Sequence, residues 1–449
     1  MPEINLQKIG HKVLKIASSL GVSSAEVFLS KSRDLSIEVS NQQVETMKLA
    51  EEQGVSIRIF QNNKLGFVYS SDFTDSALDQ MVSQAIANAK NTADDRFYIL
   101  PSKPPEKYPE LDLFDENIPR VPVEEKIALA KDIESRARKY DSRIKITERC
   151  AYSDSSYEVA VYNSLGVSGE YQGTYCGASA FLVAEEQGDS QTGFGFQYKL
   201  KYKELDPGFI ANEAAQKAVR MLGAKGINTR SMVTVIDPYV ATNFLGLMAK
   251  SLSAESVQKG KSRLAGKINE QVISPLISII DDGSKEGAIM SSPFDGEGVP
   301  CRKNVLIKKG RLQGFLHNTY TAAKEGKRST GNAVRGSYKS TPEVGTTNFY
   351  IENGTLPKEK LLNQVVEGIY ITDVLGMHTA NPISGDFSLG AAGLLIKKGE
   401  FTRPVRGIAI AGNIFDLFNA IDAVASDLTF FVGKGSPTLR ISNMTVSGN

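Results

Sequence analysis

The chain has 449 residues, and its 52 Lys and Arg residues almost equal its 51 Asp and Glu residues, which leaves a formal charge of +1. This length predicts two or three domains, and the charge balance argues against a nucleic-acid binder or a protein held on an anionic membrane. Because the apolar runs are too short for a membrane span and the first residues lack an apolar signal core, we expect a cytoplasmic protein.

Residues 1–100 predict a first block made of a helix, antiparallel strands and a second helix. Apolar residues recur at helical spacing over 5–20, and Gly21 closes that pattern. Short alternating runs follow, among which "NNKLG" predicts a hairpin turn, and residues 74–92 return to a helical period. His11 lies on the first helix and is interpreted as a solvated or packing histidine.

Residues 101–122 are expected to form an extended connector, because this region is rich in proline and charged residues. A second block over 123–228 repeats the order of helix, strands and helix, although the residue identity is too low to prove a duplication. Its glycine-rich middle, residues 166–195, is compatible with strands or with a flexible flap.

The region from 229 to 449 predicts a domain of short β runs broken by glycine. Within it, Asp237 followed by Pro238 predicts the start of a helix over 239–252. The expected inward side chains of that helix are Val240, Phe244, Leu247 and Met248.

The pentapeptide "LIKKG" occurs twice in this domain, at 306–310 and at 395–399. We interpret both copies as hairpin turns, because neither introduces a helix that could hold a phosphate. With strands in runs and no βαβ alternation, the whole chain is expected to have an α+β fold.

The common catalytic motifs are missing from the sequence. It contains no Gly-x-Ser-x-Gly nucleophile turn, no phosphate-binding loop and no dinucleotide fingerprint. A catalytic zinc site usually includes two histidines one helical turn apart, but the three histidines here, His11, His317 and His378, are far from one another in sequence. The cysteines Cys150, Cys176 and Cys301 are equally scattered, which fits a reducing compartment and three small buried side chains.

Two long-range groupings of side chains stay open. A scattered metal site would draw on His317, His378, Cys301, Asp295, Glu297 and Asp386. Alternatively, His378 with Asp386 or Asn381 would line a substrate cleft. The glycines that would permit close backbone approach there are Gly376, Gly385 and Gly390. These glycines are equally compatible with tight loops in a compact β domain.

The stretch "GMHTANPISGDFSLGAAG" at 376–393 resembles the C-terminal signature of the TldD/PmbA family, whose members are also called modulators of DNA gyrase. Three other segments agree with the family in the same order, at 263–282, 293–333 and 347–354. The resemblance is strong after residue 230 and extends over nearly the whole chain.

This resemblance implies a cytoplasmic zinc metalloprotease of peptides and poorly folded polypeptides that works as a pair of related subunits, one of which carries the metal. In that subunit a helix bears His-Glu-x-x-x-His, and a late cysteine completes the site. The matching positions here are Leu245, Gly246 and Lys250, which cannot act as that set of ligands. Cys301 also lies far before the C-terminal segment. The chain therefore resembles the PmbA (TldE) type of subunit.

The resemblance accordingly implies that this chain holds no zinc. It also implies one of two assemblies, either a heterodimer with a TldD-type subunit that carries zinc or a homodimer. A peptide or unfolded polypeptide would be the substrate. The residues expected to contact substrate or partner are His378, Asn381, Gly385, Asp386, His317, Asp295 and Glu297. The alternatives are a peptide-binding homodimer without cleavage activity and an independent hydrolase that uses His317 and His378. Direct action on DNA is disfavoured by the charge balance.

Overall fold

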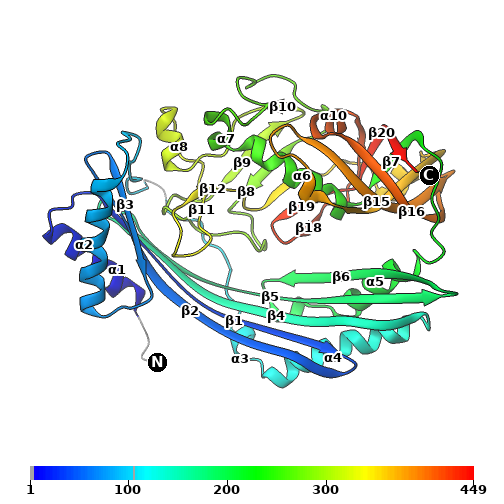
Figure 1. The fold of residues 1–449 in the computed structure, drawn as a ribbon, viewed down its shortest axis with the longest axis horizontal. Helices are drawn as coiled ribbons and strands as arrows, with labels where there is room; N and C mark the ends of the chain where they lie inside the picture. Colours follow the sequence, from blue (N-terminus) through cyan, green and yellow to red (C-terminus); the bar gives the residue numbers. More distant parts are fainter. Residues whose placement is uncertain (1–4, 105–106, 449) are drawn as a thin grey trace.

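The computed structural model describes residues 5–104 and 107–448, and the chain has the predicted α+β fold with a β-rich C-terminal domain. Both blocks contribute to one curved antiparallel sheet of six strands, in the order β3-β2-β1-β4-β5-β6 (Figure 1). Its strands are β1 (Ala25–Ser40), β2 (Gln43–Gln61), β3 (Lys64–Ser70), β4 (Ile144–Asn163), β5 (Ser168–Glu186) and β6 (Asp189–Lys199).

The two blocks meet at the β1–β4 pair, which is in register from Glu26 opposite Asn163 to Val39 opposite Cys150. This seam joins the blocks through main-chain hydrogen bonds along nearly the full length of β1. The glycine-rich middle of the second block, residues 166–195, contains β5 and most of β6, so it is built of strands and not of a flap. Gly193 on β6 shows why glycine is needed there, since a Cβ would lie 2.0 Å from the carbonyl oxygen of Ala214 on the covering helix.

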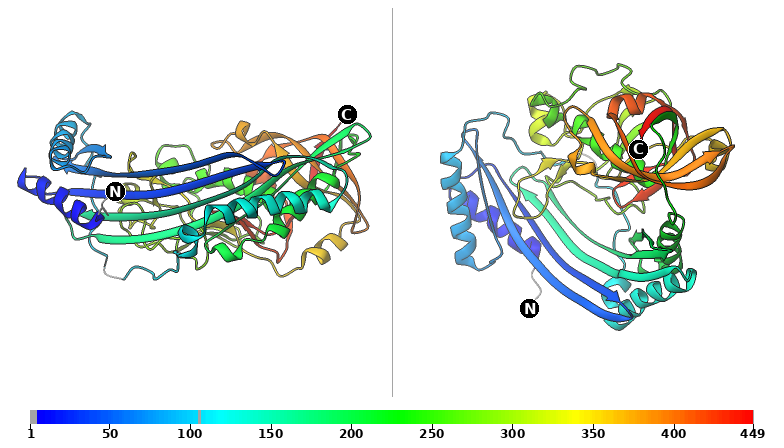
Figure 2. Two further views of the ribbon diagram at one scale, coloured as in Figure 1. Left: turned by 90° about the horizontal axis from the view of Figure 1, so that it is seen from below. Right: turned by 45° about the vertical axis from the view of Figure 1, so that its right-hand side comes forward.

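Helices cover the convex face of this sheet, and the C-terminal domain lies over its concave face (Figures 1 and 2). The helices are α1 (Leu6–Ser19), α2 (Asp75–Asn91), α3 (Asn117–Arg120), α4 (Val123–Tyr140), the short η1 (Tyr202–Glu204) and α5 (Pro207–Val219). Alternation along β1 separates the two faces. Val27, Leu29 and Ile37 pack towards the helices, whereas Phe28 packs towards Phe294 of the C-terminal domain.

The connector runs between the sheet and the C-terminal domain, and its residues 105 and 106 lie outside the described part of the chain. The Tyr108 hydroxyl donates a hydrogen bond to the carbonyl oxygen of Gly298 (2.9 Å), and the Thr174 N–H donates to Leu113 (2.8 Å). These bonds fix the connector to both neighbours.

The C-terminal domain contains two further six-stranded sheets. The first has the order β10-β9-β8-β13-β19-β18, and the second has the order β16-β15-β14-β7-β20-β17, with β16 also paired to β20. A two-stranded ribbon consists of β11 (Ala333–Val334) and β12 (Glu343–Val344). The strands of the first sheet are β8 (Ile279–Asp282), β9 (Lys303–Lys308), β10 (Arg311–Leu312), β13 (Phe349–Ile351), β18 (Thr429–Phe431) and β19 (Lys434–Ser436). Those of the second are β7 (Arg230–Ile236), β14 (Glu367–Leu375), β15 (Asp386–Lys397), β16 (Glu400–Asn413), β17 (Ile421–Val424) and β20 (Leu439–Ser447).

The predicted helix after β7 is confirmed as α6 (Pro238–Ala249), followed by a 3₁₀ turn, η2 (Lys250–Leu252). The Asp237 carboxylate caps it by accepting the N–H of Tyr239 at 2.9 Å. Val240, Phe244 and Met248 are buried in the core, and Leu247 is partly buried against it. The other helices of the domain are α7 (Ala254–Gln258), α8 (Thr319–Lys324), α9 (Lys358–Asn363), η3 (Met377–Thr379) and α10 (Ile414–Asn419).

Both "LIKKG" segments are hairpin turns, as predicted. Lys309 and Gly310 connect β9 to β10, and Lys398 and Gly399 connect β15 to β16, with positive φ at both residues of each turn. This is the two-residue turn whose twist suits an antiparallel pair. None of the helices within the described residues is long and apolar enough to cross a membrane.

Candidate functional site

Three adjoining cavities border the C-terminal domain, one against the connector, one against the concave face of the long sheet and one against β6 and α5. The connector cavity, of about 680 Å³, is lined by residues 99–104 and by loops around 300 and 328. The tyrosine cavity, of about 540 Å³, shares Cys301 with it. The helix cavity, of about 630 Å³, lies beside the start of α6 and shares Tyr198, Ile289 and Val432 with the tyrosine cavity. Together they form the candidate cleft.

The tyrosine cavity has an aromatic wall on the sheet side. The tyrosines that line it are Tyr157, Tyr171, Tyr175 and Tyr198. Phe294 of the C-terminal domain packs edge-on against Tyr171, with ring centroids 5.1 Å apart. Burial raises the pKa of Tyr157 to about 12 and also raises that of Tyr171, so both hydroxyls are protonated at neutral pH. Such a wall offers apolar area and hydrogen-bond donors to a bound chain.

The helix cavity combines aromatic rings with a polar chain. Tyr239 packs against Phe431 and Phe196, with ring centroids 5.2 Å and 6.0 Å away. The Lys358 ammonium donates to the Tyr370 hydroxyl (2.8 Å), which donates to the Asp237 carboxylate (2.6 Å). Burial, followed by the charge of Asp237, raises the pKa of Tyr370 well above its usual value.

The positions that the resemblance matches to His-Glu-x-x-x-His point in different directions on α6 and η2. The Leu245 side chain is fully buried in the core of the C-terminal domain. Gly246 faces β19, where an added Cβ would lie 2.6 Å from the Lys434 ammonium nitrogen. Lys250 is exposed. An alkyl group, a hydrogen and two nearby ammonium groups do not make a zinc site.

A buried cluster of charges connects the long sheet to the C-terminal domain. The Arg58 guanidinium on β2 bonds Glu26 on β1 at 2.6 Å and Glu297 of the C-terminal domain at 2.9 Å. Arg335 also bonds Glu26. Burial alone would raise the pKa of Glu26, but the two arginines outweigh it and hold that pKa below its ordinary value. Glu297, predicted as a substrate or interface residue, therefore takes part in an interdomain joint.

Asp295 lies next to this cluster and is fixed by main-chain donors. Its carboxylate accepts the N–H groups of Glu297 (2.9 Å), Val299 (3.0 Å) and Ala333 (3.0 Å). Burial, followed by the charge of Glu297, raises the pKa of Asp295 to about 7. Asp295 and Glu297 are brought together, and Asp295 also lines the tyrosine cavity.

His317 is buried, with 2% of its surface exposed, and neither ring nitrogen has a hydrogen-bond partner among the described residues. Its Nε2 atom lies 3.8 Å from a carboxylate oxygen of Glu325. Burial lowers the pKa of His317, which favours the neutral ring. It does not line any of the three cavities.

The 376–386 loop is bonded mainly to itself and to α10. His378 is exposed on η3, and the Asn381 side-chain oxygen accepts the N–H groups of Ile383 (2.9 Å) and Ser384 (3.2 Å). Asp386 accepts a hydrogen bond from Asn413 (2.8 Å), which lowers the pKa of Asp386. Gly385 is buried with φ +82°. None of these four predicted residues lines the three cavities, and their contact with substrate or partner stays a prediction.

Within residues 5–104 and 107–448, no three His, Cys, Asp or Glu side chains are grouped so that they could hold a metal ion. The scattered metal site considered from the sequence is therefore not formed in this part of the chain. Its cysteine, Cys301, is buried, and its Sγ atom lies 3.7 Å from the carbonyl oxygen of Gly331.

Sequence reasoning named Asp295 and Cys301 but missed the other residues that build the cleft. The aromatic wall has a visible signal, because Tyr171 and Tyr175 are separated by an even number and so share one face of a strand. Arg58, Glu26 and Arg335 carry no such signal, since their partners are hundreds of residues away in sequence or on another strand.

Comparison with known proteins agrees with this architecture over most of the chain. Residues 25–89, 116–222 and 229–448 match, in this order, the family descriptions PmbA/TldA metallopeptidase domain 1, central domain and C-terminal domain. An uncharacterized protein of Methanocaldococcus jannaschii is 31% identical, over 91% of this chain and 92% of its own. Metalloprotease PmbA of Escherichia coli O157:H7 is 28% identical, over 99% of this chain and 96% of its own.

A crystal structure from Thermotoga maritima, described as a proposed modulator of a DNA gyrase, superposes with a TM-score of 0.91 at 27% identity, covering 99% of this chain and all of the other. The agreement thus extends from the sequence motifs to the placing of the curved sheet beneath the C-terminal domain. The three consecutive family matches, the relatives similar over their full length and the shared architecture establish that this chain belongs to the PmbA/TldD metallopeptidase family.

Proposed function

We propose that this chain is a PmbA (TldE) type subunit of a two-component metallopeptidase, and that a TldD-type partner supplies the zinc. The observation that supports this most directly is the surroundings of α6. Leu245 is a core residue, Gly246 is covered by Lys434, and Lys250 points to solvent. A peptidase zinc needs three protein ligands around one open position, and these positions supply none.

In this proposal the chain holds part of an extended polypeptide for its partner. The cleft offers three adjoining cavities, and its tyrosine wall presents ring faces and hydroxyl donors. Contacts of this kind depend little on the identity of each side chain, which suits peptides and unfolded polypeptides as substrates. The three free, buried cysteines are consistent with a reducing, cytoplasmic location.

The two alternative functions need different arrangements of residues. An independent hydrolase that uses His317 and His378 would need both rings in one site, whereas His317 is buried beside Glu325 and His378 is exposed on η3. A homodimer that binds peptides without cleaving them would use the same cleft, so experiment must separate it from the leading proposal.

The test compares the purified chain alone, a TldD-type subunit from the same organism alone, and the mixture. We expect the chain alone to hold no stoichiometric zinc after dialysis and to leave unfolded casein intact. The mixture should form a complex that contains zinc and cleaves casein. A partner in which the glutamate of His-Glu-x-x-x-His is replaced by glutamine is the matched control, since it should keep zinc and pairing but lose cleavage.

Each remaining outcome selects another function. About one zinc per chain in the isolated protein, lost in His317→Ala, would contradict the proposal. Cleavage by the isolated chain would favour the independent hydrolase. Binding of casein fragments by a homodimer that ignores the TldD-type subunit would favour the binding protein.

A further inference from the structure

The connector cavity is lined by charges of one sign. The cationic residues in its lining are Lys103, Lys107, Arg302, Lys327 and Arg328. No Asp or Glu occurs among the described residues that line it. This local excess contrasts with the whole chain, where positive and negative residues balance. A cavity with this lining attracts anions.

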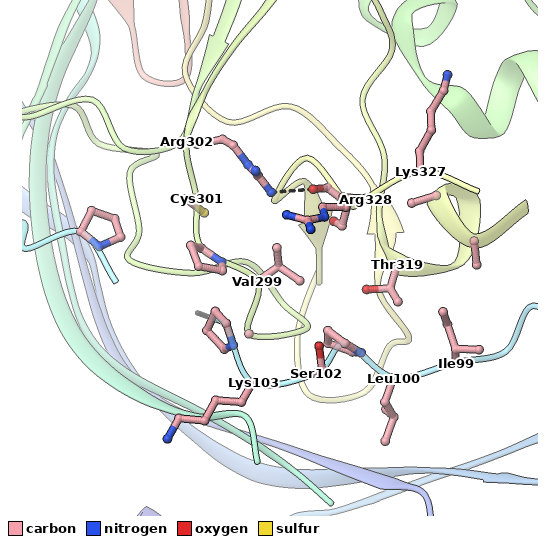
Figure 3. Close-up of a pocket in the computed structure, with 18 of the residues that line it drawn as sticks. Ile99, Leu100, Ser102, Lys103, Val299, Cys301, Arg302, Thr319, Lys327 and Arg328 are labelled. Atoms are coloured by element: carbon pink, nitrogen blue, oxygen red, sulfur yellow. Dashed lines mark hydrogen bonds between the residues drawn. The ribbon is translucent and has the colours of Figure 1, made fainter. Parts of the chain in front are cut away.

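Two of these cations are placed to hold a ligand. Figure 3 shows Arg302 and Arg328 directed to the same part of the cavity, whereas Lys103 and Lys327 extend away from it. Arg302 donates to a neutral acceptor, the carbonyl oxygen of Ser329, at 2.6 Å. Arg328 is exposed, as is Arg302, and no hydrogen bond or ion pair joins Arg328 to another residue in the described part of the chain. Both guanidinium groups therefore retain donors for an external anion.

A buried hydroxyl in the same lining also has an unused bond. Thr319 is 7% exposed, and its Oγ1 atom has no hydrogen-bond partner among the described residues. Its backbone N–H is used, because it donates to Glu297 at 2.8 Å. Buried hydroxyls are normally bonded, but this oxygen has almost no accessible surface, so it lies behind the lining and is out of reach of a molecule in the cavity. Figure 3 shows the Thr319 side chain beside the cavity.

Most of the remaining lining is apolar, although Ser102 and Ser329 also belong to it. Its apolar side chains are Ile99, Leu100, Val299, Ala322 and Ala323, together with four prolines. We propose that the connector cavity binds an oxyanion, carboxylate or phosphate, attached to a compact apolar group. Arg302 and Arg328 hold the oxyanion, and the apolar residues contact its body.

Two kinds of molecule carry such an oxyanion. One is a free small molecule that bears a carboxylate or a phosphate. The other is the C-terminal carboxylate of a peptide, which fits the position of Cys301 between the connector cavity and the tyrosine cavity. The second source rests on the proposed function, whereas the first does not. Binding in either case needs neither a partner subunit nor cleavage.

Calorimetry on the full isolated chain tests the proposal with two matched pairs of probes. The pairs are N-acetyl-alanyl-leucine with its C-terminal amide, and phenyl phosphate with phenol. We expect at least one anion to bind about tenfold or more tightly than its neutral analogue, and to weaken as salt is added. Arg328→Gln and Arg302→Gln should each weaken that binding about tenfold. Arg311→Gln, on β10 outside the cavity, is the control and should not change it.

The identity of the bound probe assigns the source. Preference for the peptide acid over its amide points to peptide C-termini, and binding of phenyl phosphate alone points to a free phosphate compound. The proposal is wrong if neither anion binds, if neutral analogues bind equally well, or if the folded Arg302→Gln and Arg328→Gln proteins bind as the unchanged chain does.

Discussion

At the scale of single residues, Gly376 and Gly385 have nearly the same backbone conformation but different surroundings. Their φ angles are +86° and +82°. A Cβ on Gly376 would meet only the Thr379 hydroxyl at 3.9 Å, whereas a Cβ on Gly385 would lie 2.6 Å from the Ile414 side chain. The pair therefore separates the cost of a left-handed backbone from the cost of crowding.

We expect Gly376→Ala to lower the free energy of unfolding by about 1 kcal/mol, the cost of a left-handed conformation. Gly385→Ala should lower it by about 2–4 kcal/mol, because the methyl group also overpacks the contact with Ile414. Urea unfolding measures both. Equal losses in the two variants would show that the loop relaxes around Ile414.

The same loop also contains two residues, Gly385 and His378, that the sequence predicts to contact substrate or partner. Gly385→Val should impair the cleavage supported in a TldD-type complex more than His378→Ala does, because valine is strained at positive φ and His378 is exposed. Casein cleavage by the mixed subunits checks this. Loss of activity in His378→Ala, with folding and pairing intact, would instead assign the imidazole a chemical role.

Asp281 makes the free energy of unfolding depend on pH. Burial raises its pKa from 3.8 to about 6, although Thr347 and Asn332 donate hydrogen bonds that act in the opposite direction. The folded chain thus holds a proton that the unfolded chain releases above about pH 4. This contribution to stability is present below pH 4 and is lost as the pH rises towards 6.

The expected loss is at most about 3 kcal/mol for a shift of this size. We would measure the free energy of unfolding in urea from pH 4.5 to 7 for the unchanged chain and for Asp281→Asn. The variant should show a shallower decline, whatever its absolute stability. An identical slope in both proteins would show that Asp281 keeps an ordinary pKa. Asp295 acts in the same direction, with its loss extending to about pH 7.

At the scale of elements, α6 and η2 carry the three positions that the resemblance matches to His-Glu-x-x-x-His, and substitutions there test whether they could hold a metal. Leu245→His should lower the free energy of unfolding by about 2–4 kcal/mol, because it puts an imidazole into a dry apolar core. Lys250→His, at an exposed position, should change it by less than about 0.5 kcal/mol.

The triple variant Leu245→His, Gly246→Glu, Lys250→His should therefore gain no stoichiometric zinc. Metal analysis after dialysis, alongside urea unfolding of each single variant, decides this. One tightly held zinc in a stable triple variant would mean that α6 and its neighbours already have the geometry of a metal site.

Local signals in the sequence were enough to predict several elements of the fold. Asp237 and Pro238 start α6, and both "LIKKG" turns follow from two residues each. The pairing of β1 with β4 was not predictable in this way, because strand propensity does not encode a partner beyond the connector. For the same reason the candidate site was only partly predicted. Asp295 lines the cleft, but the tyrosine wall and Arg58 become neighbours of the C-terminal domain only after the sheet curves beneath it.

At the scale of the whole molecule, the buried charges hold the curved sheet against the C-terminal domain. Arg58→Met should lower the free energy of unfolding by about 3–5 kcal/mol, since Glu26 and Glu297 would lose a shared buried partner. Arg149→Met removes an exposed pair with Glu38 and should cost less than about 1 kcal/mol. Urea unfolding compares the two. Equal losses of unfolding free energy in the two variants would mean that water already reaches the buried charges around Arg58.

The β1–β4 seam also has a consequence for how the protein is made. β1 leaves the ribosome well before β4, because the second helix of the first block, the whole connector and α4 lie between them. During that interval the nascent chain exposes a long strand edge, which is the kind of surface that pairs with other chains. Contacts so distant in sequence also form slowly. The first block must therefore stay protected until β4 of the second block is synthesised, so the speed of translation across the connector sets how long a growing chain is open to aggregation.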